Sequence, residues 1–295
     1  MNIRIIAVAL MIPSMLACAQ SGDNIVSDKF AKGRKLSQNV QTQLKEVSGI
    51  ASSKVNEGLM WVQNDSGNEP AVYLINRDME ILLTCRLDGV ENRDWEDIAV
   101  GPGPENGKSY VYVGDIGDNK SRHPVKFVYR FEEPVYKPGK AEIAISTIDK
   151  ITFRLSDAMK DTESLLIDHK SKNLYVISKR EEPVTVYEIQ YPFNMSDTLI
   201  AKKIMTLPFG EIVSADVDPR TGDILMKNYD KVYYWRNANS ESVASLLKRK
   251  PVEVEYEREV QGEAITWASD GSGFYTVSEQ KKKQESWLYF YPAVK

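Results

Sequence analysis

Short apolar runs recur along this chain, and five of them open with a similar marker. The markers occupy residues 47–51, 95–99, 162–166, 214–218 and 262–266. Their starts lie about 50 residues apart, with one longer gap of about 67 between the second and third, a period that is typical of propellers and solenoids. The repetition predicts a fold that is built from one recurring unit.

Each marker is followed by further runs rich in the β-branched and aromatic residues that suit a pleated sheet. Second strands are expected at residues 59–63, 110–114, 173–179, 224–228 and 274–279, and third strands at 71–76, 126–131, 184–190, 231–236 and 286–291. Four repeats contain a fourth strand, at residues 80–87, 150–155, 199–207 and 252–256.

The last repeat lacks a fourth strand, whereas a strand-like segment at 39–46, before the first marker, belongs to no repeat. We therefore predict an all-β fold: a five-bladed β-propeller of four-stranded antiparallel blades, closed by the N-terminal strand. Six blades are the alternative, because residues 135–148 add strand-like material to the second repeat. Residues 240–248 suggest a short helical insertion in the fourth repeat.

The N-terminus carries the signature of export. Residues 1–17 combine an early arginine, a short apolar run and small residues, which is the pattern of a signal peptide. The sequence around Cys18 resembles a bacterial lipobox with the lipid on Cys18, and ordinary signal-peptidase cleavage is the alternative. Residues 18–35 are expected to form a flexible tether, and residues 36–295 a single propeller domain.

These features predict an exported protein, held in the outer membrane or periplasm as a lipoprotein or, alternatively, soluble in the periplasm or secreted. Cys85, in an expected strand, would then be a lone buried thiol. The 38 basic and 42 acidic residues give a net charge of −4. Nucleic acid is therefore not an expected partner, and the membrane is one only through the lipid anchor. We expect a monomer.

Candidate chemistry gathers at one mouth of the predicted channel. The first strand of each propeller blade is innermost, so the acids in the markers should approach one another there: Glu96, Glu163, Asp216 and Glu263. The second strands run back and end at the same face. Together with Asp97, they supply the expected ligand-binding residues: Asp65, Asp115, Lys179, Lys227 and Glu279.

Clustered carboxylates repel, since two unit charges about 5 Å apart cost roughly 3 kcal/mol at an effective dielectric near 20. A bound cation could compensate, and carboxylate oxygens suit calcium. The chain has only two histidines, so a nitrogen site has little support. The alternative is that these acids are structural and pair with Lys179, Lys227 and Arg93.

Several motifs resemble a group of secreted bacterial β-propellers: Leu-Lys-Glu-Val-Ser-Gly-Ile-Ala at 44–51, Trp-Glu-Asp-Ile-Ala at 95–99, Gly-Asp-Ile-Gly-Asp-Asn at 114–119 and Gly-Glu-Ala-Ile at 262–265. The chain is similar to the SdiA-regulated family and to propellers described as having the esterase-like activity of phytase. Similar propellers, among them calcium-dependent lactonases and phytases, hold calcium with acids at the axial channel. This resemblance implies the same role for Glu96, Glu163, Asp216 and Glu263, although Ser48 and Ala215 interrupt the acidic pattern.

Two functions from different classes follow. The first is a binding propeller that takes a small or polymeric ligand, with calcium, at the acidic mouth. The alternative is a calcium-assisted hydrolase that cleaves a phosphoester, a lactone or a glycoside. A scaffold for another envelope protein is a third interpretation, and it would require a large apolar patch. Whether the protein is an enzyme, and on which ligand it acts, is left open by the residues.

Overall fold

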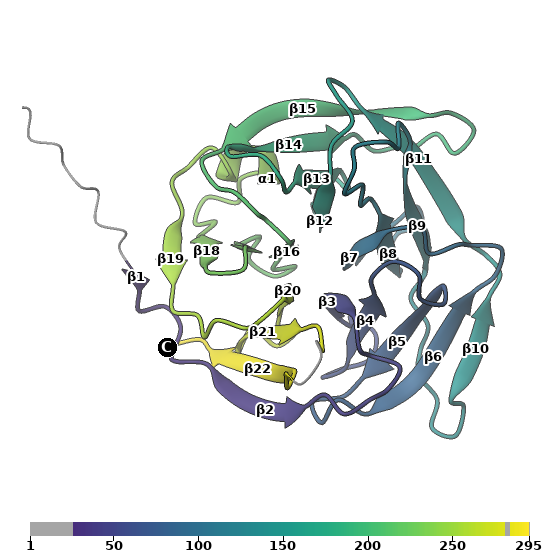
Figure 1. Cartoon of the computed structure of the whole chain (residues 1–295), viewed down its shortest axis with the longest axis vertical. Helices are drawn as coiled ribbons and strands as arrows, with labels where there is room; N and C mark the ends of the chain where they lie inside the picture. The colour runs from purple at the N-terminus through teal and green to yellow at the C-terminus, as the bar shows by residue number, and fades with distance from the viewer. Residues whose placement is uncertain (1–25, 281–283, 295) are drawn as a thin grey trace, which may run out of the picture.

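The computed structural model describes residues 26–280 and 284–294, whose sheets are arranged radially around a central axis (Figure 1). This part of the chain contains 22 strands and one short helix. It is therefore an all-β fold, as the repeated apolar runs predict. The expected signal peptide and Cys18 lie outside the described residues.

Most strands fall into antiparallel runs of four. In chain order the first runs are β3 (Val47–Ser52), β4 (Met60–Asn64), β5 (Ala71–Ile75) and β6 (Ile81–Leu87); then β7 (Trp95–Pro102), β8 (Ser109–Asp115), β9 (Lys126–Glu132) and β11 (Asp149–Leu155); then β12 (Thr162–Ile167), β13 (Leu174–Ser178), β14 (Val184–Ile189) and β15 (Leu199–Leu207). They are followed by β16 (Ser214–Val217), β17 (Ile224–Lys227), β18 (Val232–Trp235) and β19 (Val252–Val254), and by β20 (Gly262–Trp267), β21 (Gly273–Ser278), β22 (Trp287–Pro292) and β2 (Arg34–Gln38). The helix α1 (Val243–Leu246) lies between β18 and β19, within the expected insertion.

The innermost strands form a closed ring. β3 contacts β7, β7 contacts β12, β12 contacts β16, β16 contacts β20, and β20 contacts β3 again. Apolar clusters fill the spaces between neighbouring runs; the cluster around Leu165 and Tyr112, for example, joins the run of β7 to the run of β12. Because the core is divided in this way, each run is held by both of its neighbours and the axis is left to polar side chains.

Parallel pairings cover several outer edges. β10 (Glu142–Ile145) pairs in parallel with β6, β1 (Val26–Ser27) with β19, and the first residues of β15 with β11. This last pairing merges two runs into one eight-stranded sheet. The segment 135–148, on which a sixth blade would depend, thus contributes one strand to the outer edge of the first run.

The closing strand differs from the expected one. β2 pairs with β22, whereas residues 39–46 form a turn that leads into β3. The Asn39 side chain explains the difference, because its amide nitrogen donates to the Leu44 carbonyl at 2.6 Å and its oxygen accepts from the Gln41 N–H at 3.1 Å. Such local side-chain bonds compete with strand pairing. Leu44 is fully buried, so the alternating pattern reflects one anchoring contact rather than a strand.

The expected tether also requires correction over its described part. Phe30 is only 3% exposed, and its ring packs on those of Tyr234, Trp267 and Phe274. Residues 26–35 therefore belong to the folded domain. The sequence does not mark this, because a single aromatic residue in a polar segment has no periodicity to reveal it.

Cys85 lies in β6 with no exposed surface, which confirms the expected buried thiol. Burial raises the pKa of Cys85 to about 12. Among the described residues, no helix has the length and apolarity needed to cross a membrane.

Candidate functional site

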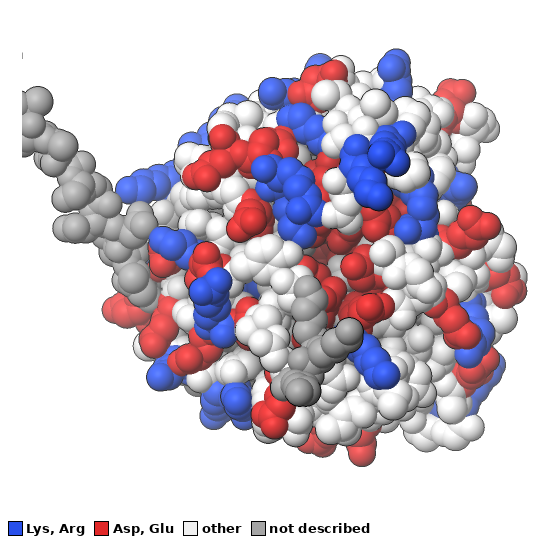
Figure 2. All heavy atoms as spheres, viewed as in Figure 1, with Lys and Arg blue, Asp and Glu red and all other residues white. Residues whose placement is uncertain are grey.

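A β-bulge positions the acids of the markers. In β3, β7, β12 and β20 the pairing with the following strand skips one residue near the start of the strand, and the skipped residues are Ser48, Glu96, Glu163 and Glu263. A bulged residue leaves the regular alternation, so the bulge can re-aim its side chain. The three glutamates reach the mouth of the channel in this way. Figure 2 shows acidic side chains gathered at the centre of this face, with basic side chains around them.

Five carboxylates form the centre of the site, which we call the acidic mouth: Asp65, Asp94, Glu96, Asp161 and Glu163. Oxygens of Glu96, Asp161 and Glu163 lie within 4.8 Å of one another, and so do oxygens of Asp65, Asp94 and Glu96. Glu96 is therefore common to both groups. Such groups of carboxylate oxygens could hold a metal ion, with a donor set that suits a hard cation such as calcium.

Part of the charge of the acidic mouth is compensated by protein groups. Lys179 Nζ lies 2.6 Å from Glu163, and Arg180 Nε lies 2.7 Å from Asp161. Burial lowers the pKa of Lys179, but the Glu163 carboxylate outweighs burial, so the pKa lies above its ordinary value. We treat Glu163 and Lys179 as an ion pair.

The other part is uncompensated. Within the described chain, neither the Asp94 nor the Glu96 carboxylate accepts a hydrogen bond or forms an ion pair. Burial, with the charges of Asp65 and Asp161 beside it, raises the pKa of Asp94 to about 6. Burial, reinforced by Glu163, raises the pKa of Glu96 well above its ordinary value. These two carboxylates are the part of the site that most needs a cation or a proton.

The loop after β8 closes over these two carboxylates. A Cβ at its Gly117 would overlap the carboxylates of Glu96 and Asp94, so a side chain there would force these carboxylates to move. The Asp118 amide donates to Asp161 at 2.8 Å, while the Asp118 carboxylate accepts from the amides of Arg122 and His123. The glycine of this motif thus permits a close backbone approach, and Asp118 supports the loop.

Glu263 lies on the same mouth but outside the two groups of carboxylates. Its carboxylate accepts from the Tyr229 hydroxyl at 2.6 Å and from the Gln261 amide at 3.2 Å. Lys227, expected to bind ligand, is fully buried and donates to the Gly262 carbonyl. Burial lowers the pKa of Lys227 to about 8, against the opposing charge of Glu259. Lys227 therefore supports β20, the strand that carries Glu263, through a hydrogen bond to its backbone.

The remaining predicted ligand-binding residues are less accessible. Asp97 is fully buried in the channel and accepts from the amides of Ile98 and Leu165 and from the Ser214 hydroxyl. Burial raises the pKa of Asp97 well above its ordinary value. Asp115 accepts from the Asp94 amide at 3.2 Å and lies 3.4 Å from Arg93, and Glu279 is 9% exposed. Of the predicted ligand-binding residues, Asp65 and Lys179 are the ones that adjoin the two groups of carboxylates.

Asp216 does not join the acidic mouth, and this expectation requires correction. β16 pairs with β17 without a bulge, so Asp216 keeps a regular strand position. Its carboxylate accepts from the Thr266 hydroxyl at 2.8 Å and the Trp267 amide at 2.9 Å. It lines a separate cavity of about 800 Å³ together with His169 and Trp267. Burial raises the pKa of Asp216 to about 7 and lowers that of His169 to about 4.

Two members of the acidic mouth, Asp94 and Asp161, are absent from the sequence-based set. Each stands two residues before a bulged glutamate, so Asp-x-Glu occurs at 94–96 and again at 161–163. That repeated spacing was a usable signal. The two acids of each pair reach the same mouth only because the strand has a bulge at the glutamate, and a bulge is not visible in the sequence pattern.

Comparison with known proteins identifies the fold and no family. No protein-family model and no curated protein matches the chain. Among solved structures, the PQQ-bound form of aldose sugar dehydrogenase from Streptomyces coelicolor is similar, with a TM-score of 0.50 and 10% sequence identity. The match covers 88% of this chain and 99% of that one. At this level of identity the structural similarity shows only the fold: the chain has a β-propeller-type fold.

Proposed function

We propose that this protein is a five-bladed propeller that binds calcium and an additional ligand at the acidic mouth. The closed ring of inner strands supports the blade count. One observation carries the calcium site: Glu96 is shared by two groups of carboxylates, and neither Glu96 nor Asp94 has a hydrogen-bonding or ionic partner within the described residues. Uncompensated buried carboxylates are costly, and a divalent cation relieves that cost.

In this proposal Asp65, Asp94, Glu96, Asp161 and Glu163 supply the oxygen donors. A bound cation would neutralise the mouth and would offer a positive centre to an anionic or carbonyl oxygen of the ligand. Lys179 and Arg180, which already pair with Glu163 and Asp161, would hold those carboxylates in place. The ligand itself is a small molecule or a polymer of undefined identity.

The test is titration calorimetry of the purified chain with calcium, and with magnesium for comparison. We expect calcium to bind and Glu163→Gln, which keeps a hydrogen-bonding group opposite Lys179, to weaken binding at least about tenfold, or about 1.4 kcal/mol. Lys32→Gln, which alters an exposed residue of the Glu257 ion pair, serves as a control and should leave calcium binding unchanged. Absence of calcium binding in the parent chain would refute the site.

A second candidate is a calcium-assisted hydrolase. It is favoured by the pKa of Asp94, which at about 6 is close to the value that suits a general acid or base near neutral pH. Phosphoester and lactone cleavage would use the cation to polarise an oxygen, whereas glycoside cleavage would use two of the carboxylates. A screen of the three substrate classes with calcium and with chelator distinguishes this function from binding alone. Turnover that needs calcium and is lost in Asp94→Asn would favour the hydrolase.

We also propose that the protein is exported and held at the outer membrane or in the periplasm through lipid on Cys18, as a monomer. The lipobox-like sequence supports this location, with soluble periplasmic or secreted protein as the alternative. Mass spectrometry of the mature N-terminus would distinguish a diacylglyceryl cysteine from a cleaved peptide.

A further inference from the structure

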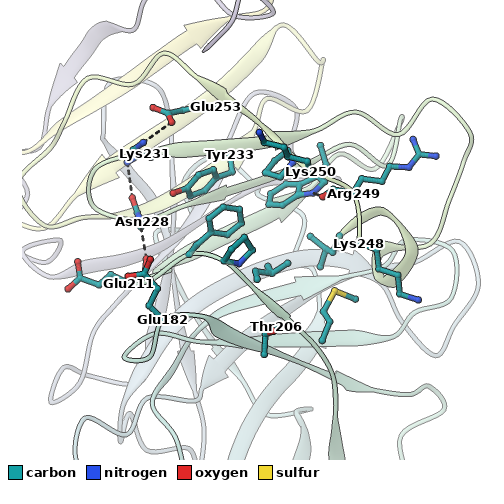
Figure 3. Close-up of a pocket in the computed structure, with 18 of the residues that line it drawn as sticks. Glu182, Thr206, Glu211, Asn228, Lys231, Tyr233, Lys248, Arg249, Lys250 and Glu253 are labelled. Carbon is teal, nitrogen blue, oxygen red and sulfur yellow. Dashed lines mark hydrogen bonds and ion pairs between the residues drawn. The ribbon is translucent and has the colours of Figure 1, made fainter. Parts of the chain in front are cut away.

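A groove of about 950 Å³ lies between the third and fourth runs of strands, and none of the five carboxylates of the acidic mouth lines it (Figure 3). It is bounded by the end of β15, by the turn between β17 and β18, and by the segment after α1. Its floor is aromatic: the rings of Phe209 and Tyr233 stack with centroids 4.0 Å apart, and Trp235 meets Phe209 edge-on. Phe209 and Tyr233 remain partly exposed.

The strand that borders this groove has an open edge. β15 pairs with β11 only at Leu199–Ala201, and from Ile204 onward it has a strand on one side, β14, within the described residues. An exposed edge offers backbone N–H and C=O groups to another strand. Two other outer edges in this fold are covered by an added strand, and both additions run parallel to the strand they cover.

The charges around the groove are segregated. In Figure 3, Lys248 and Arg249 project on one side, Glu182 and Glu211 lie on the other, and Tyr233 and Lys250 lie between them. Arg249 pairs with Glu241 at 2.6 Å. No ion pair involves Lys248, Lys250, Glu182 or Glu211 in the part of the chain that the structure describes. Glu211 lies four residues beyond the last residue of β15, Leu207, so the acidic end of the groove is near the C-terminal end of that strand.

From the open edge, the aromatic floor and the segregated charges, we propose that this groove binds an extended peptide of a partner protein, which adds to the edge of β15 as a strand. A peptide that runs parallel to β15 begins beside Lys248, passes Lys250 and ends beside Glu182 and Glu211. This peptide is therefore acidic at its N-terminal end, apolar or aromatic over the aromatic floor, and basic at its C-terminal end. Backbone pairing supplies affinity and the charged ends supply direction.

The probe is a fluorescent peptide, Asp-Glu-Thr-Val-Tyr-Val-Thr-Lys-Lys, measured by fluorescence polarisation against the full chain. The comparison peptide carries the two charged ends exchanged. We expect the exchanged peptide to bind at least about tenfold more weakly. Equal binding of the two peptides, or no binding of either, would overturn the proposal.

Protein variants locate the site. Phe209→Ala, and the double change Lys248→Glu with Lys250→Glu, should each weaken binding about tenfold or more. The control reverses the charges of Lys137 and Lys140, which are exposed three residues apart before β10, and this variant should bind like the parent. Circular dichroism confirms that each variant is folded. If the control weakens binding as much as the groove variants, the attraction is general and the groove is not the site.

Backbone pairing is tested separately with N-methylated probes. A strand bound by one edge uses alternate amides, so methylation of one alternate set should abolish binding and methylation of the other should leave it. Insensitivity of both sets would overturn strand addition. Two further outcomes would also overturn the proposal. The first is displacement of the peptide by cellohexaose, which would make a carbohydrate the occupant of the groove. The second is self-association in sedimentation that Lys248→Glu with Lys250→Glu abolishes, which would make a second copy of the chain the occupant.

Discussion

Removal of the Glu96 charge should stabilise the calcium-free protein. Glu96 oxygens lie within 4.8 Å of carboxylate oxygens on both sides, and two unit charges at 4.8 Å repel by about 3.5 kcal/mol at an effective dielectric of 20. Partial protonation and the charge of Lys179 reduce this value. We therefore expect Glu96→Gln at pH 8 in chelator to raise the free energy of unfolding by about 2 kcal/mol. In a domain of this size that is about 3–4 °C in the thermal midpoint.

Calcium should reverse the order of the two proteins. At about 100 times its dissociation constant, calcium stabilises the parent by about 2.7 kcal/mol. Glu96→Gln loses the ligand shared by both groups of carboxylates and should show little rise. The assay is thermal unfolding followed by circular dichroism at pH 8, with chelator and then with excess calcium or magnesium.

The matched control is Glu263→Gln, which changes another bulged glutamate on the same mouth. Its carboxylate already has the Tyr229 hydroxyl as partner, so its calcium response should match that of the parent. Destabilisation of Glu96→Gln in chelator, or an undiminished calcium response in that variant, would refute the reasoning. Loss of the response in Glu263→Gln as well would favour a wider acidic ring.

Three further predictions follow from named contacts. The pKa of Asp94 is about 6 in the folded protein against an ordinary value of 3.8, so the folded state retains a proton that the unfolded state has released. This contribution to stability is fully present below about pH 4 and is lost as the pH rises through about 6. Asp216, whose pKa is raised to about 7, also titrates in this range, so the test is a difference between two proteins. Because Asp94 is only partly buried, we expect the parent to lose about 1 kcal/mol more than Asp94→Asn between pH 4.5 and pH 7, measured by urea unfolding in chelator. Gly117→Ala should place a methyl group against the Glu96 and Asp94 carboxylates, and calorimetry should show calcium binding weakened about tenfold or more while the chain stays folded; unchanged affinity would contradict the close approach of the loop. Phe30→Ala should cost about 3–5 kcal/mol of unfolding free energy, the usual cost of an emptied aromatic site, whereas a cost below about 1 kcal/mol would show that residues before β2 do not stabilise the domain.

The repeating architecture could be predicted because each run begins with a short apolar segment that is buried on both faces. Leu165 and Leu166, for example, lie in β12 and enter different apolar clusters on opposite sides of the sheet. Such a segment is recognisable without any tertiary information. The same periodicity misplaced the closing strand at 39–46, because a local turn held by Asn39 and one buried leucine imitates an alternating strand. The difference depends on side-chain hydrogen bonds that no apolar pattern records.

The candidate site depends on a single register feature, which explains why its residues could be predicted only in part. Glu96 and Glu163 lie in strands where the pairing skips one residue, and their side chains meet at the mouth. Asp216 stands one place later in an aligned marker, and its strand has no bulge, so it lies on Thr266 and Trp267 instead. The prediction grouped Asp216 with the glutamates in spite of this offset, whereas a shift of one residue turns a strand side chain towards a different face. The residues that precede the bulges, Asp94 and Asp161, then complete the acidic mouth, so the relation between acids is determined by strand pairing as much as by their spacing in the chain.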